Sequence, residues 1–168
     1  MLVFRCTHRV VKRFKLPIID DAPASSGTLG DWYANLLNIG RSRLVLCQSE
    51  RSLLPVILPA RNAAFPAAFG AALGAMLGEL GVRRDLIKRE VAAANDIVFS
   101  RPRSRQVLGA MNDFAFNVEV YLADAGGNDP ALKACLRLAE MPSKPIGFES
   151  PDRFTRSLFE AVEGKKKG

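Results

Sequence analysis

Three short strand-like segments follow one another between residues 32 and 58, and they constrain the fold more than any other feature of the chain. They cover residues 32–38, 44–48 and 53–58, with the turns Ile39-Gly-Arg-Ser42 and Ser49-Glu-Arg-Ser52 between them. Connections this short favour an antiparallel meander. The third segment contains Pro55 and is expected at an edge of the sheet, because proline cannot donate a hydrogen bond to a neighbouring strand.

The rest of the chain contains further strand patterns and several helical ones. Strands are predicted at residues 2–6 and 96–100, where apolar and branched residues dominate. Helical periodicity marks residues 8–14, 66–80, 83–95, 104–123, 130–141 and 152–163. The sequence therefore predicts a single α+β domain at residues 1–163, with an antiparallel sheet of about four or five strands and helices packed on one face. Residues 164–168 are predicted to form a basic tail.

The helix expected at residues 66–80 carries a stripe of glycine, formed by Gly70, Gly74 and Gly78. Glycine costs about 1 kcal/mol relative to alanine in a helix interior, so such a stripe needs a packing reason. Close packing against the sheet or another helix is the favoured interpretation, and a homodimer face is the alternative. The apolar run from Ala63 to Gly78 is interrupted by proline and too short to span a membrane, so no membrane partner is expected.

The balance of charge is basic, with 24 Lys and Arg against 17 Asp and Glu and a net charge of +7. Such an excess favours contact with nucleic acid or an acidic protein, although a merely basic surface is the alternative. Cys6, Cys47 and Cys135 are widely spaced and include no Cys-x-x-Cys pair, which indicates neither a disulfide framework nor a zinc site. A reducing, cytoplasmic location fits this cysteine usage best. His8 is the single histidine, so a histidine-based metal site is excluded, and no cofactor is expected.

Two segments supply the candidate site residues. Asp31, Tyr33 and Asn35 alternate along one face of a predicted strand, which is either a solvated face or the floor of a cleft. Glu50 and Arg51 lie in the turn that follows the second strand of the meander.

The second segment is the start of the helix at residues 104–123. Arg101, Arg103 and Arg105 surround this helix start, where guanidinium groups and first-turn amides suit phosphate, or where the arginines pair with acidic residues as structural contacts. Arg105, Gly109 and Asn112 share one face of the helix, with Asp113 beside them. This face is interpreted as an anion site or as a polar staple between helix and sheet, and the staple is preferred.

Three blocks of the chain resemble an uncharacterised family of short bacterial proteins, a domain of unknown function. The family blocks read Leu-Gly-x-Trp-Tyr-Ala-Asn-Leu, Asn-Glu-Arg/Lys-Thr/Ser-Leu-Leu and Arg-Ser-Val-Leu-Gly-Ser-Met-Asn-Asp, and here they lie at residues 29–36, 49–54 and 105–113. The resemblance implies no activity. Gln106 and Ala110 replace the two serines of the third block and Ser49 replaces the asparagine of the second, so neither helix serine of the family pattern can be an obligatory nucleophile here.

No Gly-rich phosphate loop, G-x-S-x-G elbow or H-E-x-x-H motif occurs in the chain, so whether it is an enzyme stays open. The preferred hypothesis is a non-enzymatic binding or regulatory protein of the bacterial cytoplasm, which engages nucleic acid or an acidic protein through a basic surface. One alternative is an enzyme for a phosphate- or amide-bearing substrate, with Arg105 as anion clamp, Asp31 or Glu50 as base and Asn112 as orienting residue. Another is a homodimeric or toxin–antitoxin-like interaction protein.

Overall fold

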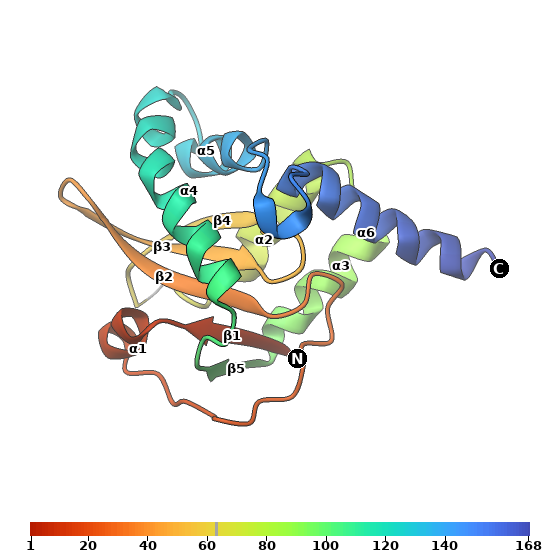
Figure 1. Cartoon of the computed structure of the whole chain (residues 1–168), viewed down its shortest axis with the longest axis horizontal. Coiled ribbons are helices and arrows are strands. Elements are labelled where there is room, and N and C mark those ends of the chain that lie inside the picture. The colour runs from red at the N-terminus through yellow and green to blue at the C-terminus, as the bar shows by residue number, and fades with distance from the viewer. Residues whose placement is uncertain (63) are drawn as a thin grey trace.

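Five strands form one sheet in the order β4-β3-β2-β1-β5, as Figure 1 shows. The structure is a computed structural model and describes residues 1–62 and 64–168. The strands are β1 (Leu2–Cys6), β2 (Trp32–Ile39), β3 (Ser42–Ser49), β4 (Pro55–Pro59) and β5 (Ile97–Ser100). The helices are α1 (His8–Phe14), α2 (Phe69–Glu79), α3 (Arg84–Ala92), α4 (Arg105–Asp124), α5 (Pro130–Leu138) and α6 (Pro151–Lys166), with short 3-10 turns η1 (Ala93–Asn95) and η2 (Lys144–Ile146). The α+β class and a five-stranded sheet are thus confirmed.

The sheet is mixed, which corrects the expectation of antiparallel pairing throughout. Strands β2, β3 and β4 form the predicted antiparallel meander. The first strand, in contrast, is parallel to both of its neighbours, β2 and β5. Parallel neighbours need long connections, and the loop after α1 and the segment containing α2 and α3 provide them. Strand β4 lies at the edge of the sheet, as its prolines predict.

Helices cover both faces of the sheet, whereas the sequence predicted one covered face. Adjacent residues of a strand point to opposite faces. Trp32 packs edge-on against Phe69 of α2 at a ring-centroid distance of 4.8 Å. Its neighbour Tyr33 instead accepts a hydrogen bond at the start of α4, from the backbone N–H of Ser104. Both side chains are fully buried, so the alternation within β2 separates two core layers rather than core from solvent.

Two glycines of the α2 stripe face another helix. A Cβ atom at Gly70 or Gly74 would meet the Val91 side chain of α3 at 3.4 or 3.5 Å, an ordinary van der Waals distance, so α2 and α3 are in contact along this side. Gly78 has open space around it. The preferred interpretation, close packing against another helix, is therefore confirmed for two of the three glycines. Of the apolar run at residues 63–78, residue 63 lies outside the described residues.

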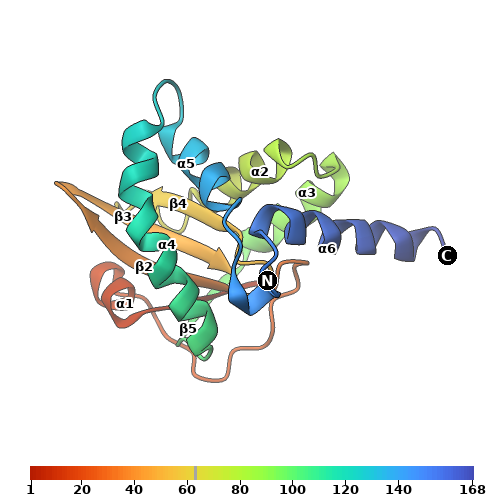
Figure 2. The same ribbon diagram turned by 45° about the horizontal axis from the view of Figure 1, so that its top comes forward.

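The α4 helix crosses the sheet with a sharply divided surface. Ser104 caps its start by accepting a hydrogen bond from the Val107 N–H, as expected of a serine at this position. The side chains that face the sheet are buried, namely Val107, Ala110, Met111, Phe114 and Val118. In both Figure 1 and Figure 2, α4 runs in front of the sheet, and no other helix lies over its outer side.

The α6 helix projects from the body of the domain toward the C-terminus (Figure 2). It continues to Lys166, so most of the segment expected to be a basic tail is helical. Thr155 anchors the helix by donating a hydrogen bond to the buried Ser52 hydroxyl at 2.9 Å. Across the described parts of the chain, no helix combines the length and the apolar character that crossing a membrane requires.

The loop before β2 is held by one buried carboxylate, that of Glu90 in α3. Glu90 accepts hydrogen bonds from the backbone N–H groups of Thr28 and Leu29 at 2.7 and 3.0 Å. The contact is tight, since a Cβ atom at Gly27 would lie 2.5 Å from a Glu90 oxygen. This loop delivers Asp31 to the sheet, so Glu90 helps to position the site described below.

We expect the Glu90→Gln substitution to lower the free energy of unfolding by about 1–3 kcal/mol, because an amide cannot accept both backbone hydrogen bonds in place of the two carboxylate oxygens. Chemical denaturation followed by circular dichroism measures the change. Glu79→Gln is the matched control, since Glu79 is exposed at the end of α2. Equal effects of the two substitutions would contradict the anchoring role of Glu90.

Candidate functional site

A row of polar side chains runs across the α4 side of the sheet. Ser100 pairs with Arg5, Arg5 with Tyr33, and Tyr33 with Gln48 in the register of four adjacent strands. Arg5 is 5% exposed and the other three are fully buried. Buried polar groups are costly unless they are hydrogen-bonded. The partners of this row therefore decide what the site can do.

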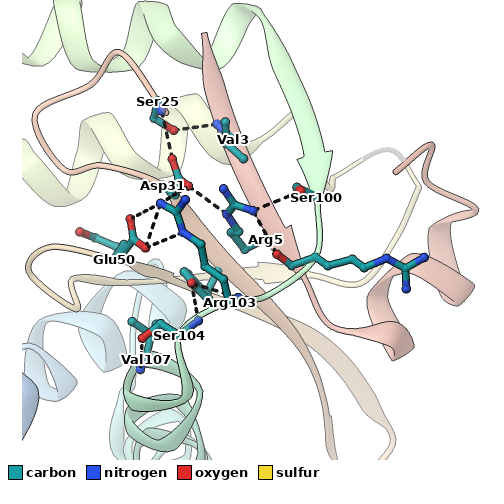
Figure 3. Close-up of polar contacts among 12 residues, drawn as sticks. Val3, Arg5, Ser25, Asp31, Glu50, Ser100, Arg103, Ser104 and Val107 are labelled. Atoms are coloured by element: carbon teal, nitrogen blue, oxygen red, sulfur yellow. Dashed lines mark hydrogen bonds and ion pairs between the residues drawn. The ribbon is translucent and has the colours of Figure 1, made fainter. Parts of the chain in front are cut away.

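Arg5 is the central residue of the row, and its partner is Asp31. The Arg5 Nε donates to Asp31 Oδ2 at 2.9 Å, and both side chains are almost completely buried. Another Arg5 nitrogen donates to the Ser100 hydroxyl and to the Arg101 carbonyl, each at 3.2 Å. The Asp31 carboxylate also accepts from the Ser25 backbone N–H at 3.0 Å. Figure 3 shows how these groups converge from two strands and two loops.

Arg103 covers this buried pair from the outside. One of its terminal nitrogens lies 3.3 Å from Asp31 Oδ2 and 3.4 Å from Glu50 Oε1, so Arg103 bridges the two carboxylates. Its side chain remains about half exposed. The backbone N–H groups of Arg103 and Ser104 both point to the Tyr33 hydroxyl, at 3.4 and 3.0 Å. The chain between β5 and α4 is thereby fixed to the centre of the sheet.

The electrostatics of Asp31 favour a carboxylate that is ionised at neutral pH. Burial alone would raise its pKa, but hydrogen bonds from Ser25 and Arg5, together with the positive charge of Arg5, outweigh that effect and leave the pKa of Asp31 below its usual value. A general base that works near neutral pH needs a raised carboxylate pKa and a free lone pair toward the substrate. Asp31 has a lowered pKa, and both of its oxygens accept internal hydrogen bonds.

The structure brings together four of the ten residues predicted from the sequence: Asp31, Tyr33, Glu50 and Arg103. The side chains of the other six lie apart from this cluster, although the Arg101 backbone carbonyl accepts a hydrogen bond from Arg5. Arg101 is exposed and pairs with Asp20 in the loop after α1. Arg51 is exposed and donates to the Thr28 carbonyl. The Asn35 side chain accepts hydrogen bonds from the Thr7 hydroxyl and the Leu36 backbone N–H.

Arg105, Asn112 and Asp113 lie on the outer side of α4. All three are exposed, and among the described residues none of their side chains makes a hydrogen bond or ion pair. The predicted staple between α4 and the sheet exists, but Tyr33 and Arg103 form it. Arg105 and Asn112 take no part, because the buried face of α4 lies on the opposite side of the helix. The four groups of the enzyme hypothesis, Asp31, Glu50, Arg105 and Asn112, consequently do not converge.

The turn between β3 and β4 is built on buried hydroxyl groups rather than on its charged residues. Ser49 donates to the Leu29 carbonyl at 2.8 Å and accepts from Ser52. Ser52 in turn accepts from Thr155 of α6 and from the Leu54 backbone. This network explains the small hydroxyl residue at position 52 and ties the turn to α6.

The cysteines and the histidine offer no metal site. No cluster of three His, Cys, Asp or Glu side chains suited to a metal ion occurs among residues 1–62 and 64–168. Cys6, Cys47 and Cys135 are all buried with free thiols. Burial raises the pKa of Cys6 and of Cys135 to about 12, so these thiols are poor nucleophiles. His8 is exposed on α1.

Sequence reasoning missed a second cluster, which we call the basic end. It consists of six cationic side chains contributed by α1, by the β2–β3 hairpin and by the segment after β4: Arg9, Lys12, Arg13, Arg41, Arg43 and Arg61. Contacts place these three segments together. Arg13 donates to the Ala60 carbonyl, and the Ala60 N–H donates to the Arg43 carbonyl. Arg9 donates to the Leu36 carbonyl of β2.

The basic end has little acidic surface to neutralise it. Within the described chain, none of its six cations lies in an ion pair, whereas Arg101 and Arg103 are both paired. A signal for this cluster exists in the sequence, because residues 1–19, 32–49 and 51–78 contain no Asp or Glu. Arginine is locally dense at residues 101–105, but acidic partners for Arg101 and Arg103 come from distant segments.

Comparison with curated proteins finds no match, and comparison with solved structures finds none either. One family model matches, a domain of unknown function designated DUF6933, and it covers residues 3–154. The match spans all of the sheet except Leu2, and helices α1 to α5. It therefore includes the basic end and the buried polar site, which we call the Asp31 cluster and which consists of Arg5, Asp31, Tyr33, Glu50 and Arg103. The chain therefore belongs to the DUF6933 family.

Proposed function

We propose that this protein binds nucleic acid through the basic end. The observation that carries the proposal is the gathering of six cations from three separate segments, without carboxylate partners among the described residues. Residues 1–78 hold nine Lys and Arg against four Asp and Glu, so they carry five of the seven net positive charges of the chain. Unpaired surface cations of this density attract a polyanion and speed its association.

The chemistry of these cations favours phosphate over a protein carboxylate partner. Five of the six are arginine, and its planar guanidinium binds a phosphate through two parallel hydrogen bonds. The β2 and β3 strands have eight residues each, against five in β1. The hairpin consequently extends beyond the rest of the sheet, as Figure 1 shows. A two-stranded ribbon of this kind fits the major groove of DNA.

The Asp31 cluster has a structural role in this proposal. Its charges neutralise one another, and its hydrogen bonds fix the start of α4 to the sheet. A rigid sheet in turn fixes the position of α1 relative to the β2–β3 hairpin. A location in the bacterial cytoplasm belongs to the same proposal, and three buried free thiols suit a reducing compartment.

The test is a salt titration of binding to a fluorescein-labelled DNA duplex of about 20 base pairs, measured by fluorescence anisotropy. If each of the six cations neutralises one phosphate, a logarithmic plot of affinity against salt has a slope of about −5. A labelled poly-glutamate peptide is the comparison ligand. No binding to duplex at low salt would contradict the proposal, and equally tight binding of poly-glutamate would indicate an acidic protein partner instead.

A further inference from the structure

The outer side of α4 carries side chains that no element of the described chain covers. Phe116 is 83% exposed and Val120 is 55% exposed, one helical turn apart. Arg105, Gly109, Asn112 and Glu119 lie on the same side of the helix, all exposed. Large apolar side chains presented together with polar ones on a helix face are typical of an interaction surface.

Gly109 lies in the interior of this twenty-residue helix, and no contact among the described residues requires a glycine there. A methyl group added at Gly109 would meet no atom within 4 Å. The glycines of α2 behave differently, since Gly70 and Gly74 face α3 closely. Glycine weakens a helix, so Gly109 destabilises α4 without any packing benefit within the described chain. The missing side chain leaves a notch on the outer side of α4, where a side chain of another molecule can approach the helix backbone.

A groove of about 640 Å³ continues this notch. Its wall opposite α4 comes from the segment between α5 and α6 and includes Met141, Pro142 and Phe148. Phe148 is 69% exposed. Its φ of +61° places it in the left-handed region, which is unfavourable for a bulky residue. An aromatic side chain seated against Gly109 would lie beside the groove whose opposite wall includes Phe148.

This face of α4 is complementary to the same face of a second copy when the two helices run antiparallel. Consider a twofold axis beside Asn112 and Asp113, with two copies of α4 running antiparallel. Gly109 and Phe116 lie equally far on either side of that point, so each Phe116 would face the Gly109 notch of the other copy. An isologous interface requires this reciprocal matching, in which the same patch serves both subunits.

The charges follow the same symmetry. Arg105 and Glu119 lie at nearly equal distances on opposite sides of the axis, so each Arg105 would face the Glu119 of the other copy. Neither residue has an ion-pair partner within the part of the chain that the structure describes. Shape and the Arg105–Glu119 charges thus match in one register.

We propose that the protein forms a homodimer by antiparallel pairing of α4, with Phe116 of each copy seated in the Gly109 notch of the other. The paired surface of one helix, about 30 Å long, is at the small end of specific interfaces. We therefore expect a dissociation constant of about 10–100 μM. The interface residues are not members of the basic end, but Asn112, Phe116 and Glu119 line a groove together with Arg9, so the dimer is tested in the absence of nucleic acid.

Sedimentation equilibrium without nucleic acid, at about 5 to 500 μM protein, tests the proposal over the expected range. The mass is expected to rise from the 18.3 kDa of the monomer toward twice that value. A monomer mass over the whole range would overturn the proposal. Lys88→Glu is the control, because Lys88 is exposed on α3, and it is expected to leave the dissociation constant unchanged.

The Gly109→Leu substitution distinguishes a loss of dimerisation from a loss of folding. The leucine has room within the monomer and a better helix propensity, so the melting temperature is expected to stay the same or rise by about 2–4 °C. The filled notch is expected to raise the dissociation constant at least about tenfold. A Gly109→Leu protein that dimerises as well as the wild type would overturn the assigned interface.

A charge swap tests the antiparallel register. Arg105→Glu and Glu119→Arg are each expected to raise the dissociation constant about fivefold, and the double substitution is expected to restore it to within about twofold. In a parallel pair, each Arg105 would face the other Arg105, and the double substitution would restore nothing. Failure of the restoration, with both single substitutions weakening the dimer, would overturn the register.

Discussion

Asp31→Asn is expected to lower the free energy of unfolding by about 3 kcal/mol, because it removes the anionic partner of a buried cation. The neutral side chain leaves the Arg5 guanidinium buried at 5% exposure without its anionic partner. The exposed cation Arg103 loses only one of its two carboxylate partners. Urea denaturation followed by circular dichroism measures the loss.

The matched control is Asp20→Asn. Asp20 also forms an ion pair with an arginine, Arg101, but both side chains are more than three-quarters exposed. Exposed pairs contribute little, so this substitution is expected to change the free energy of unfolding by less than about 0.5 kcal/mol. Similar losses for Asp31→Asn and Asp20→Asn would contradict the central role of the buried pair.

A double-mutant cycle isolates the Arg5–Asp31 interaction. Arg5→Met alone is expected to cost about 3 kcal/mol, because it leaves the buried Asp31 carboxylate without its closest cation. The double substitution Arg5→Met/Asp31→Asn leaves neither charge unpaired and is expected to cost at least about 2 kcal/mol less than the sum of the single losses. Additive losses would show that the two residues stabilise the protein independently.

The pH dependence of stability follows from the same pair. The pKa of Asp31 in the folded protein lies below its ordinary value of 3.8. Its contribution is therefore fully present above about pH 4 to 5 and is lost as the pH falls through the lowered folded-state pKa. We expect the gap in unfolding free energy between wild type and Asp31→Asn to be constant from pH 5 to 7 and to shrink below about pH 4. A gap that widens at low pH would contradict the lowered pKa.

The second large effect concerns the basic end. The triple substitution Lys12→Glu/Arg41→Glu/Arg61→Glu reverses one exposed cation in each of the three segments. Each lost phosphate contact lowers the salt slope by about 0.9, so affinity for duplex DNA near 0.1 M salt is expected to fall at least about 100-fold. Fluorescence anisotropy of the labelled duplex measures this loss, and the residual salt slope is expected to be about −2 to −3.

The control for charge alone is Arg84→Glu/Lys88→Glu/Arg89→Glu in α3. It makes the same change in net charge with three exposed residues of a single helix. We expect affinity to fall less than about fivefold, because these cations contribute only to the long-range field. An equal loss in both triple variants would mean that binding depends on net charge rather than on the basic end.

The meander and the edge strand could be predicted because their signals are local. Short turns between β2, β3 and β4 allow only neighbouring antiparallel strands, and Pro55 places β4 at the edge. The parallel pairs of β1 could not be predicted in this way. Their partners begin at Trp32 and Ile97, and nothing in the intervening sequence specifies which strand is neighbour to which. Pairings of that kind depend on the packing of α2, α3 and α4.

The site shows the same division between local and distant information. The polar alternation of Asp31, Tyr33 and Asn35 indicated a special face, and two of the three residues do lie in the buried cluster. Arg5, however, has the sequence signature of an exposed strand residue, and its partner is 26 positions away. Buried ion pairs between distant segments leave no periodic pattern. The prediction that Arg105 and Asn112 form the staple is wrong for a related reason, because spacing shows which residues share a face but not which way that face points.

The most direct test of nucleic-acid binding at the basic end is a titration of the 15N-labelled protein with a short DNA duplex, followed by two-dimensional amide spectra. Our account predicts that the largest shifts fall on residues 8–15 of α1 and its C-terminal cap, on residues 38–43 of the hairpin and on residues 60–62 after β4. It also predicts that the amide signals of α3 and α6 do not shift. Shifts centred on residues 101–113, or unchanged spectra at low salt, would contradict it.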